Sequence, residues 1–441
     1  MKRTTIILIL IAAGLASFVY VYEVRHGKPR DEPSETGKPA FTFKSEDLAS
    51  LTLTRAGQKM VMENFDGKWV IKAPVNTPAD QTAVGSLVND ITGARIERSL
   101  AASADDLKSY GLHEPTVIVE VKLRSGEQHS IRLGTKDFSG LSAYAQIDGA
   151  KDVALVPSSL LTDADKPLND LRDRSVLGVS QYEVSELTIQ NEHGRLTLTK
   201  REGDWMIKSP IETLADDGEM SSLLSEISSA KAVDFVSEST EDLKKYGLDK
   251  PTITINAQLQ AGGERALTVG SKAEDHYFAK NSAQPQIFKV ESSLYERLNT
   301  QLSALRDKQV VKLNKEELTR VRITNPNVSL VAEKDKDGKW VIKEPSDKKD
   351  KEAQSWRIFD PLETNKATEI LDRPPASMVA KLRKPAVEVI LTGKDGKVTS
   401  LQISAAEGDQ VYVRVVGRPE IYKVGKQMLD SLSFKAADVV L

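Results

Sequence analysis

The sequence predicts an α+β fold in which an N-terminal transmembrane helix precedes three tandem β-rich repeat units, the third of them degenerate. Three observations predict this organisation. An uncharged apolar run opens the chain, three motifs recur at near-constant spacing, and each recurring segment passes from strand-like to helix-like apolar spacing. The length of 441 residues also suits about three domains of ordinary size.

The composition indicates a globular chain and argues against a nucleic-acid partner. Apolar residues make up 39% and charged residues 28% of the sequence, enough for several cores and a well-solvated surface. The 61 basic residues nearly balance the 64 acidic ones, so no basic field is available to bind phosphates. Because the chain has no cysteine, disulfides, thiol nucleophiles and thiolate metal sites are excluded together.

Residues 1–26 are predicted to form a transmembrane anchor. As a helix, the uncharged run 4–22 covers about 28 Å, close to a hydrocarbon core of about 30 Å. The alternative is a cleaved signal peptide ending near Ala16, although the apolar run continues to Tyr22, beyond a typical signal core. Residues 27–39, rich in Pro, Gly and charge, are predicted to be a flexible linker. We therefore expect an inner or cytoplasmic membrane protein with its body on the periplasmic or extracellular side.

Self-comparison reveals the internal repeat. Trp69 in GKWVIKAPVNT recurs as Trp205 in GDWMIKSPIET, 136 residues later. Tyr110 in DDLKSYGLHEPT recurs as Tyr246 in EDLKKYGLDKPT at the same offset. Separate motifs in a fixed order at a constant offset indicate duplicated structural units.

A Leu-Arg-Asp motif closes each of the first two copies. It contains Arg172 in the first copy and Arg306 in the second, 134 residues apart. These recurrences place repeat unit 1 at 40–178 and repeat unit 2 at 179–312. The remainder, 313–441, is predicted to be a degenerate repeat unit 3.

The third copy departs from the pattern. Trp340 lies in a segment that matches the opening hairpin, but Trp356 in SWRIFDPLET matches the continuation better, because PLET parallels PIET and PVNT. The simplest interpretation is an inserted strand and loop that contains the charged run SDKKDKEAQ. The Tyr-Gly-Leu motif and most of Leu-Arg-Asp are lost.

The opening of each unit is predicted to be a β-hairpin followed by an amphipathic helix. Apolar residues alternate along 48–55 and on both sides of Asp66-Gly67, a hairpin-turn signal. Helical spacing follows within 83–91 and again within 220–227.

The second half of each unit is predicted to begin with a capped helix and to continue as strands. Ser103 precedes Asp106 by three residues, and Ser239 precedes Asp242 likewise, which is an acidic variant of the capping box. The glycine of Tyr-Gly-Leu suits a left-handed helix end. A closing helix is expected at 168–174, after four strands at 116–123, 129–134, 143–147 and 152–156.

These motifs resemble a bacterial envelope family catalogued as domain of unknown function forty-three-forty. The resemblance rests on Trp-x-Ile-x-x-Pro, Tyr-Gly-Leu-x-x-Pro and Leu-Arg-Asp-Arg or Leu-Arg-Asp-Lys, and it covers 40–312 well and 313–441 poorly. Many members are encoded beside ABC-transporter components of the gliding-motility auxiliary type. The resemblance therefore implies an accessory role in an envelope complex, and it supplies no catalytic residues.

Site signals in the sequence each have a simpler structural interpretation. A calcium-loop spacing lies between two strand patterns, which favours a charged hairpin turn; its residues are Glu333, Asp335, Asp337, Gly338 and Glu344. The five histidines are scattered without a zinc or triad pattern. Gly262-Gly263 is interpreted as a hairpin turn. We expect no metal site, no cofactor and no catalytic residue.

The expected function is a non-enzymatic docking or spacer subunit that binds a protein partner in an envelope complex, accessory to an ABC-type transporter or a gliding-related assembly. The arginines of Leu-Arg-Asp are either an exposed partner contact or helix-end ion pairs. One alternative function is a glycan-binding surface module with the tryptophans as platforms, although a once-per-unit strand tryptophan favours a core position. A second alternative is an unrecognised hydrolase with a non-local motif.

Overall fold

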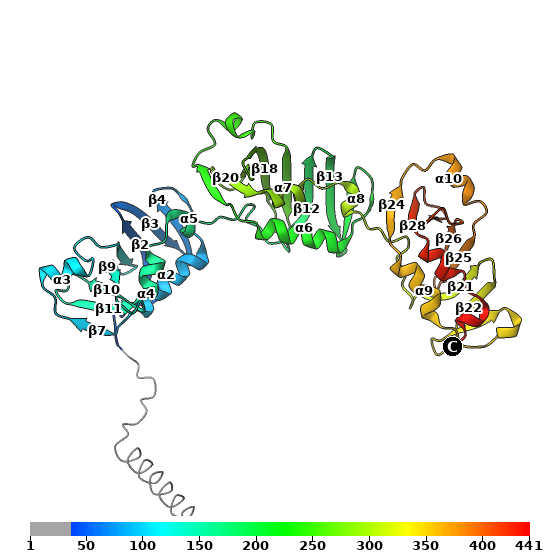
Figure 1. Ribbon diagram of the computed structural model, residues 1–441, viewed down its shortest axis with the longest axis horizontal. Helices are drawn as coiled ribbons and strands as arrows, with labels where there is room; N and C mark the ends of the chain where they lie inside the picture. Colours follow the sequence, from blue (N-terminus) through cyan, green and yellow to red (C-terminus); the bar gives the residue numbers. More distant parts are fainter. Residues whose placement is uncertain (1–36) are drawn as a thin grey trace, which may run out of the picture. The chain divides into compact units, whose positions relative to one another are not determined.

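The computed structural model describes residues 37–441, which form two compact units, 37–174 and 175–441. The first unit contains a nine-stranded sheet, the first sheet; the second unit contains a nine-stranded second sheet and an eight-stranded third sheet. Helices are short and few beside the strands in each of them (Figure 1). Every neighbouring pair of strands described in these sheets is antiparallel.

The first sheet has the strand order β5-β4-β3-β2-β8-β9-β10-β11-β7. Its strands are β2 (Leu48–Arg55), β3 (Gln58–Phe65), β4 (Lys68–Ala73), β5 (Thr77–Pro78), β7 (Arg98–Leu100), β8 (Val117–Leu123), β9 (Gln128–Lys136), β10 (Ser142–Ile147) and β11 (Val153–Pro157). A separate pair, β1 (Lys38–Pro39) and β6 (Arg95–Ile96), lies beside it. The helices are η1 (Ser45–Asp47), α2 (Gln81–Gly93), α3 (Ala104–Ser109), α4 (Ser158–Ala164) and α5 (Leu168–Leu171).

The core of the first unit lies between the first sheet and its helices. Alternate residues of β2 and β8 are buried, as strand periodicity requires. Helix α2 begins after Asp80, whose carboxylate accepts hydrogen bonds from the amides of Thr82 and Ala83, and the helix buries the apolar stripe Val84, Leu87, Val88 and Ile91. The predicted hairpin and amphipathic helix are confirmed.

The second sheet repeats this order as β15-β14-β13-β12-β17-β18-β19-β20-β16. Its strands are β12 (Val184–Asn191), β13 (Gly194–Arg201), β14 (Asp204–Ser209), β15 (Thr213–Leu214), β16 (Asp234–Ser237), β17 (Ile253–Leu259), β18 (Glu264–Ala273), β19 (His276–Asn281) and β20 (Ile287–Glu291). The helices are α6 (Asp217–Ser229), η2 (Leu243–Tyr246), α7 (Ser292–Leu298) and α8 (Leu302–Leu305).

The third sheet has the order β23-β22-β21-β25-β26-β27-β28-β24. Its strands are β21 (Leu318–Thr324), β22 (Ser329–Lys334), β23 (Trp340–Glu344), β24 (Ala367–Leu371), β25 (Val387–Gly393), β26 (Val398–Ile403), β27 (Gln410–Val415) and β28 (Ile421–Gly425). The helices are η3 (Ser346–Lys348), α9 (Ser355–Thr364), α10 (Ala376–Lys381), α11 (Gln427–Leu432) and η4 (Ala436–Val439).

The predicted α+β class is wrong, because the fold is mainly β, with 43% strand against 22% helix. The strands before and after the main helix form one sheet, because β2 pairs directly with β8. The predicted closing helix shrinks to the four residues of α5. The helical spacing of apolar residues within 83–91 therefore predicts the helix α2 correctly, but one helix packed on a large sheet does not make the fold α+β.

The predicted transmembrane helix is not supported by the structure. No helix within residues 37–441 is long and apolar enough to cross a membrane. The run 4–22 itself, with the predicted anchor 1–26 and most of the linker 27–39, lies outside the described residues.

The third copy contains no inserted strand. Trp340 begins β23, which pairs with β22 through the same bulged register that joins β3 to β4. Trp356 lies instead in the first turn of α9, the counterpart of α2 and α6. The likeness of PLET to PIET was misleading, because this segment is the end of a helix. The charged run forms a longer turn that contains η3 and returns to the sheet through one bridge, Val341 to Glu352.

One predicted cap is also wrong. Ser103 caps α3 through the amide of Asp106, and the Asp106 carboxylate accepts from the Ser103 amide in return. In the second copy, the expected helix is only the 3₁₀ turn η2, and Asp242 before it has a positive φ of 58°. Ser239 therefore caps no helix, because the chain turns at Asp242 and not three residues earlier.

Candidate docking surfaces on the first unit

The repeated tryptophans are core residues. Trp69, Trp205 and Trp340 are 6%, 7% and 6% exposed and lie on the equivalent strands β4, β14 and β23. An indole buried to this degree has no free face for a sugar ring. Trp356 differs, because it is 52% exposed and stacks under the guanidinium of Arg357 at 4.9 Å.

The Tyr-Gly-Leu motif shapes a close approach of two backbones. The carbonyl of Tyr110 accepts a hydrogen bond from the Thr135 amide, and a Cβ on Gly134 would lie 2.0 Å from that carbonyl oxygen. In the second copy, a Cβ on Gly270 would lie 2.2 Å from the carbonyl oxygen of Tyr246. Both contacts need glycine in the strand.

The rings of the two tyrosines stay within their own sheets. Tyr110 stacks on Tyr144 with ring centroids 4.2 Å apart, and Tyr246 meets the edge of Phe278 at 5.0 Å. Tyr246 is buried, and Tyr110 is half-buried. The motif therefore holds the turn against the sheet.

The arginines of Leu-Arg-Asp are buried. Arg172 is 2% exposed and Arg306 is 6% exposed. The Nη1 of Arg306 donates to Asp372 Oδ1 at 2.7 Å, in the loop after β24, so this arginine links the second and third sheets of one unit. Beside each arginine, the backbone pairs with the segment that enters the main helix, at Ala79 and Ala215.

The remaining signals fall at turns and at the surface of sheets. Asp335 accepts hydrogen bonds from the amides of Asp337 and Lys339, which forms the predicted hairpin turn between β22 and β23. His129 lies between two carboxylates, with Nδ1 2.9 Å from Asp148 and Nε2 3.2 Å from Glu127. Among residues 37–441, no group of three or more His, Asp or Glu side chains is placed to hold a metal ion.

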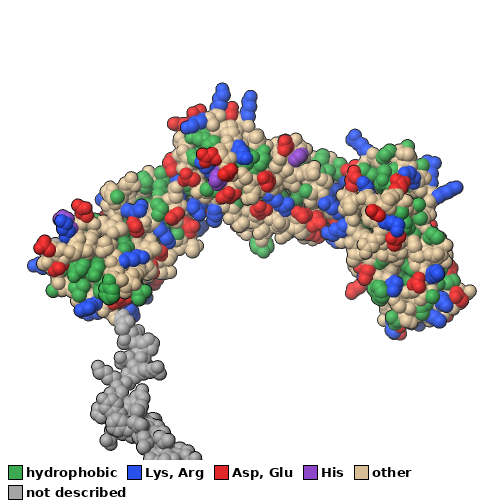
Figure 2. All heavy atoms as spheres, in the orientation of Figure 1, with side chains coloured by type: hydrophobic (Ala, Val, Ile, Leu, Met, Phe, Trp, Pro, Cys, Tyr) green, Lys and Arg blue, Asp and Glu red, His purple; other side chains and the backbone are tan. Residues whose placement is uncertain are grey.

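A hairpin tip on the first unit carries two exposed apolar side chains. Residues 137–141 join β9 to β10, and within them Phe138 is 102% exposed and Leu141 is 76% exposed. The counterpart between β18 and β19 is the two-residue turn 274–275. Hydrophobic side chains gather over the end of the first unit that carries α3, β7 and β11 (Figure 2). Such exposure of large apolar side chains marks interaction sites.

Hydrogen bonds hold this hairpin tip in one conformation. The Asp137 carboxylate accepts from the Ser139 hydroxyl at 2.8 Å and from the Ser142 amide at 3.2 Å. Partial desolvation alone would raise the pKa of Asp137, but these hydrogen bonds outweigh it and hold the pKa below its ordinary value. The Leu141 carbonyl accepts from the Ser158 amide, which ties the tip to α4. Phe138 and Leu141 are thus presented by an ordered frame.

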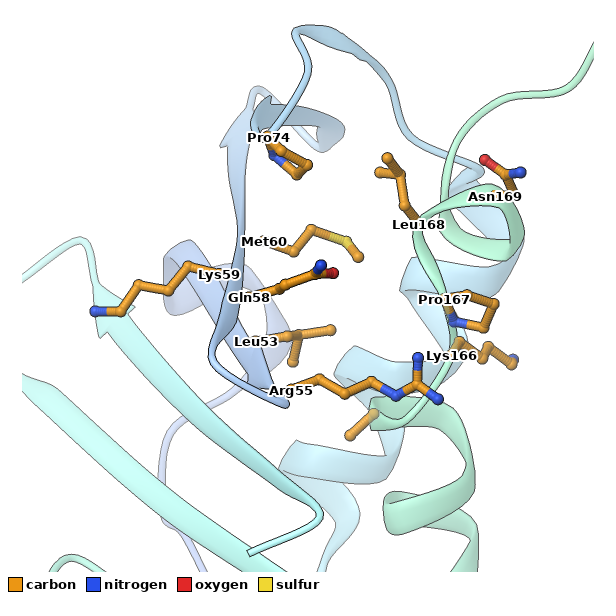
Figure 3. A pocket seen from close by; sticks show the side chains of 11 residues that line it. Leu53, Arg55, Gln58, Lys59, Met60, Pro74, Lys166, Pro167, Leu168 and Asn169 are labelled. Atoms are coloured by element: carbon orange, nitrogen blue, oxygen red, sulfur yellow. The ribbon is translucent and has the colours of Figure 1, made fainter. Parts of the chain in front are cut away.

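A groove of about 640 Å³ opens elsewhere on the same unit, between the β2–β3 hairpin and the segment that joins α4 to α5. Its apolar lining residues are Leu53, Met60, Pro74, Ala164, Pro167 and Leu168. The side chains of Met60 and Leu168 point toward one another from opposite walls (Figure 3). The volume is in the range of sites that bury a small ligand or a few side chains.

Three basic residues also line the groove, and none of its lining residues is acidic. Arg55 extends across the floor, whereas Lys59 and Lys166 point away from it (Figure 3). The Nε of Arg55 donates to Asp165 Oδ1 at 2.5 Å, and the Arg55 side chain remains 50% exposed.

Neither surface was among the residues expected from the sequence. The motifs that recur contain residues that pack in the interior of their own copies, so recurrence points to core residues. Differences between the copies mark these two surfaces in the sequence. When the copies are aligned, the first has a five-residue loop, 137–141, where the second has the two-residue turn 274–275. The first copy also has Arg55 where the others have Asn191 and Asn325.

The fold defines a class of protein, a mainly β tandem-repeat protein, and its first unit carries an exposed apolar hairpin tip and a groove. A family model matches residues 69–251 and again 205–378. The chain belongs to the family described as Domain of unknown function (DUF4340). The matches begin at Trp69 and Trp205, so they follow the repeat.

A comparison with curated proteins finds no match. Among solved structures, the chain is similar to a putative DNA polymerase III beta subunit from Eubacterium rectale, at 8% identity and a TM-score of 0.14. That alignment covers 88% of this chain and 93% of the other. A similarity at this score carries no argument about fold or function.

Proposed function

We propose that the chain is a non-enzymatic docking or spacer subunit of a cell-envelope complex, accessory to an ABC-type transporter or a gliding-related assembly. The observation that carries the docking role is the exposure of Phe138 and Leu141 on a hydrogen-bonded hairpin tip. The resemblance of the repeated motifs to the envelope family supports the kind of complex.

An ordered apolar tip suits binding for an energetic reason. Burying a Phe or Leu side chain contributes about 1.5–3 kcal/mol, and a frame that is already ordered loses little conformational entropy when it binds. The tip stays in place because Asp137 and Ser158 fix it from both ends. The two exposed side chains are therefore suited to insert into an apolar pocket of a partner.

The test is recovery of partners from cells that express the full chain at its native level. Purification under mild detergent should recover a transporter-type or gliding-type subunit with the wild-type chain, and at least about tenfold less with Phe138→Ser/Leu141→Ser. Tyr182→Ser is the matched control, because Tyr182 is 75% exposed on the second unit. Equal recovery with all three chains, or recovery of no such subunit, would contradict the proposal.

A further inference from the structure

At the position that corresponds to this groove, the other two copies share one hydrogen-bonded arrangement. In the second copy, the buried Asn191 donates through its amide to the carbonyls of Leu298 and Thr300, at 3.1 and 2.7 Å. In the third copy, Asn325 makes the same pair of contacts, with the carbonyls of Leu432 and Phe434 at 2.8 and 3.0 Å. We call each of these an asparagine clamp. It ties the opening hairpin to the segment after the α7 or α11 helix.

The first unit has Arg55 at the clamp position. Its longer side chain runs past the hairpin and reaches Asp165 by an ion pair at the surface. The residue at the end of the facing helix is smaller than its counterpart, because Ala164 stands where the second copy has Leu298. The first difference removes the clamp and the second removes side-chain volume, and Arg55 and Ala164 both line the groove.

The wall of the groove shows the result. Leu196 and Leu330, on β13 and β22, are 5% and 0% exposed under the clamps. Met60, the counterpart on β3, is only half-buried and faces Leu168 across the groove (Figure 3). A methionine at such a site adapts its shape to what it contacts. The first unit thus exposes apolar surface that the other copies bury.

The charge of the groove identifies the chemistry of its occupant. Asp165 engages Arg55 through Nε, and among the described residues it is the one hydrogen-bond partner of that side chain. The terminal nitrogens of a guanidinium carry four further donors in a planar fork, which matches a carboxylate. Asp165 offsets part of the Arg55 charge, but it occupies only the Nε donor, and no acidic residue lines the groove itself. A carboxylate brought by the occupant therefore meets unpaired donors on Arg55.

We propose that this groove binds an apolar segment of a partner protein, with an Asp or Glu side chain of that segment held by Arg55. The apolar side chains of the segment fill the space between Met60 and Leu168. This docking site is separate from the hairpin tip, so each has its own test.

Peptide binding to the full chain tests the proposal. The probes are three pools of fluorescein-labelled, acetylated and amidated nonapeptides with mixed Leu, Ile, Val, Phe and Ala positions around a central Glu, Gln or Lys. Fluorescence anisotropy should show the Glu pool binding about tenfold or more tighter than the Gln pool, because a charge-assisted hydrogen bond is lost with Gln. The Lys pool should be weaker still.

Three variants assign the binding to the groove. Arg55→Gln should weaken the Glu pool to the level of the Gln pool and leave the Gln pool unchanged. Ala164→Leu should weaken the binding of both pools at least about tenfold, because the larger side chain fills the groove. Arg55→Asn/Ala164→Leu restores the clamp, and it should weaken binding equally if Ala164→Leu alone strains the fold. Lys108→Gln is the matched charge control and should change nothing, because Lys108 is exposed on α3 of the same unit and does not line the groove.

Several outcomes would overturn the proposal. One is a wild-type chain that binds none of the pools; the others are equal loss of Glu-pool and Gln-pool binding with Arg55→Gln, and unchanged binding with Ala164→Leu. If Gln peptides with a free C-terminal carboxylate bind more tightly than the amidated Glu pool, the occupant of the groove is the C-terminal end of a chain instead. Self-association of the full chain that Ala164→Leu abolishes would assign it to a second copy. Phe138→Ser/Leu141→Ser should retain peptide binding, which separates this result from the proposed function.

Discussion

Removal of the asparagine clamp should loosen the second copy far more than the equivalent change loosens the first. Asn191→Ala deletes two hydrogen bonds to the carbonyls of Leu298 and Thr300 from a side chain that is 6% exposed. Each such bond contributes about 1 kcal/mol, and carbonyls left without a partner add to the cost. We expect local destabilisation of about 2–4 kcal/mol. Arg55→Ala breaks a half-exposed ion pair and should cost about 1 kcal/mol or less.

Hydrogen exchange of the full chain is the appropriate assay, because a chain of several compact parts does not unfold in one step. Amides of α7 and β12 should exchange roughly 30-fold to several hundred-fold faster in Asn191→Ala, while amides of α4 and β2 should change less than about tenfold in Arg55→Ala. Asn191→Asp is the control, because it keeps the acceptor for the His193 amide and loses the donors. It should be at least as destabilising as Asn191→Ala. Similar effects of Asn191→Ala and Arg55→Ala would refute the clamp as the cause of the closed groove.

Two further predictions follow from contacts elsewhere in the chain. Gly134→Ala should destabilise the first unit by about 1–3 kcal/mol, because its Cβ would lie 2.0 Å from the Tyr110 carbonyl oxygen. Gly85→Ala, whose Cβ would have no atom within 4 Å, should be neutral or stabilise α2 by up to about 1 kcal/mol. Thermal unfolding followed by circular dichroism distinguishes the two variants. Burial alone would raise the pKa of Asp216, but backbone amides at the start of α6 and the Lys366 ammonium outweigh it and lower the pKa. The stabilising contribution of Asp216 is therefore present above its unfolded-state pKa of about 3.9 and is lost as the pH falls through its lower folded-state pKa. Hydrogen exchange of amides near α6 should accelerate below about pH 4. Asp216→Asn should flatten that acceleration.

Local patterns predicted the elements but not the fold class. The alternation around Asp66-Gly67 and the stripe within 83–91 each describe one element, and both are present. The pairing of β2 with β8 joins segments far apart in the chain, and no local pattern specifies it. The same limit explains Trp356, whose segment was matched to the continuation of the hairpin through PLET although it forms the helix α9.

Recurrence predicted structure better than it predicted function. Trp69 recurs in all three copies as a buried indole. Tyr110 and Arg172 recur in the second copy, where they serve the same tight backbone approach and the same closing bridge. The candidate docking features lie where the first unit differs from the others, at Phe138 and Arg55. The outcome of those differences depends on which segments face each other in space, so the sequence alone shows the differences without the surfaces that they create.

The most direct test of the docking role is photo-crosslinking in living cells, with a photoreactive phenylalanine placed at position 138 or at position 182. Phe138 and Tyr182 are both highly exposed, but only Phe138 lies on the ordered apolar tip. Mass spectrometry should identify one envelope-complex subunit crosslinked from position 138 at several times the yield from position 182. Equal yields from both positions, or crosslinks from 138 to abundant unrelated proteins alone, would contradict the docking role of the first unit.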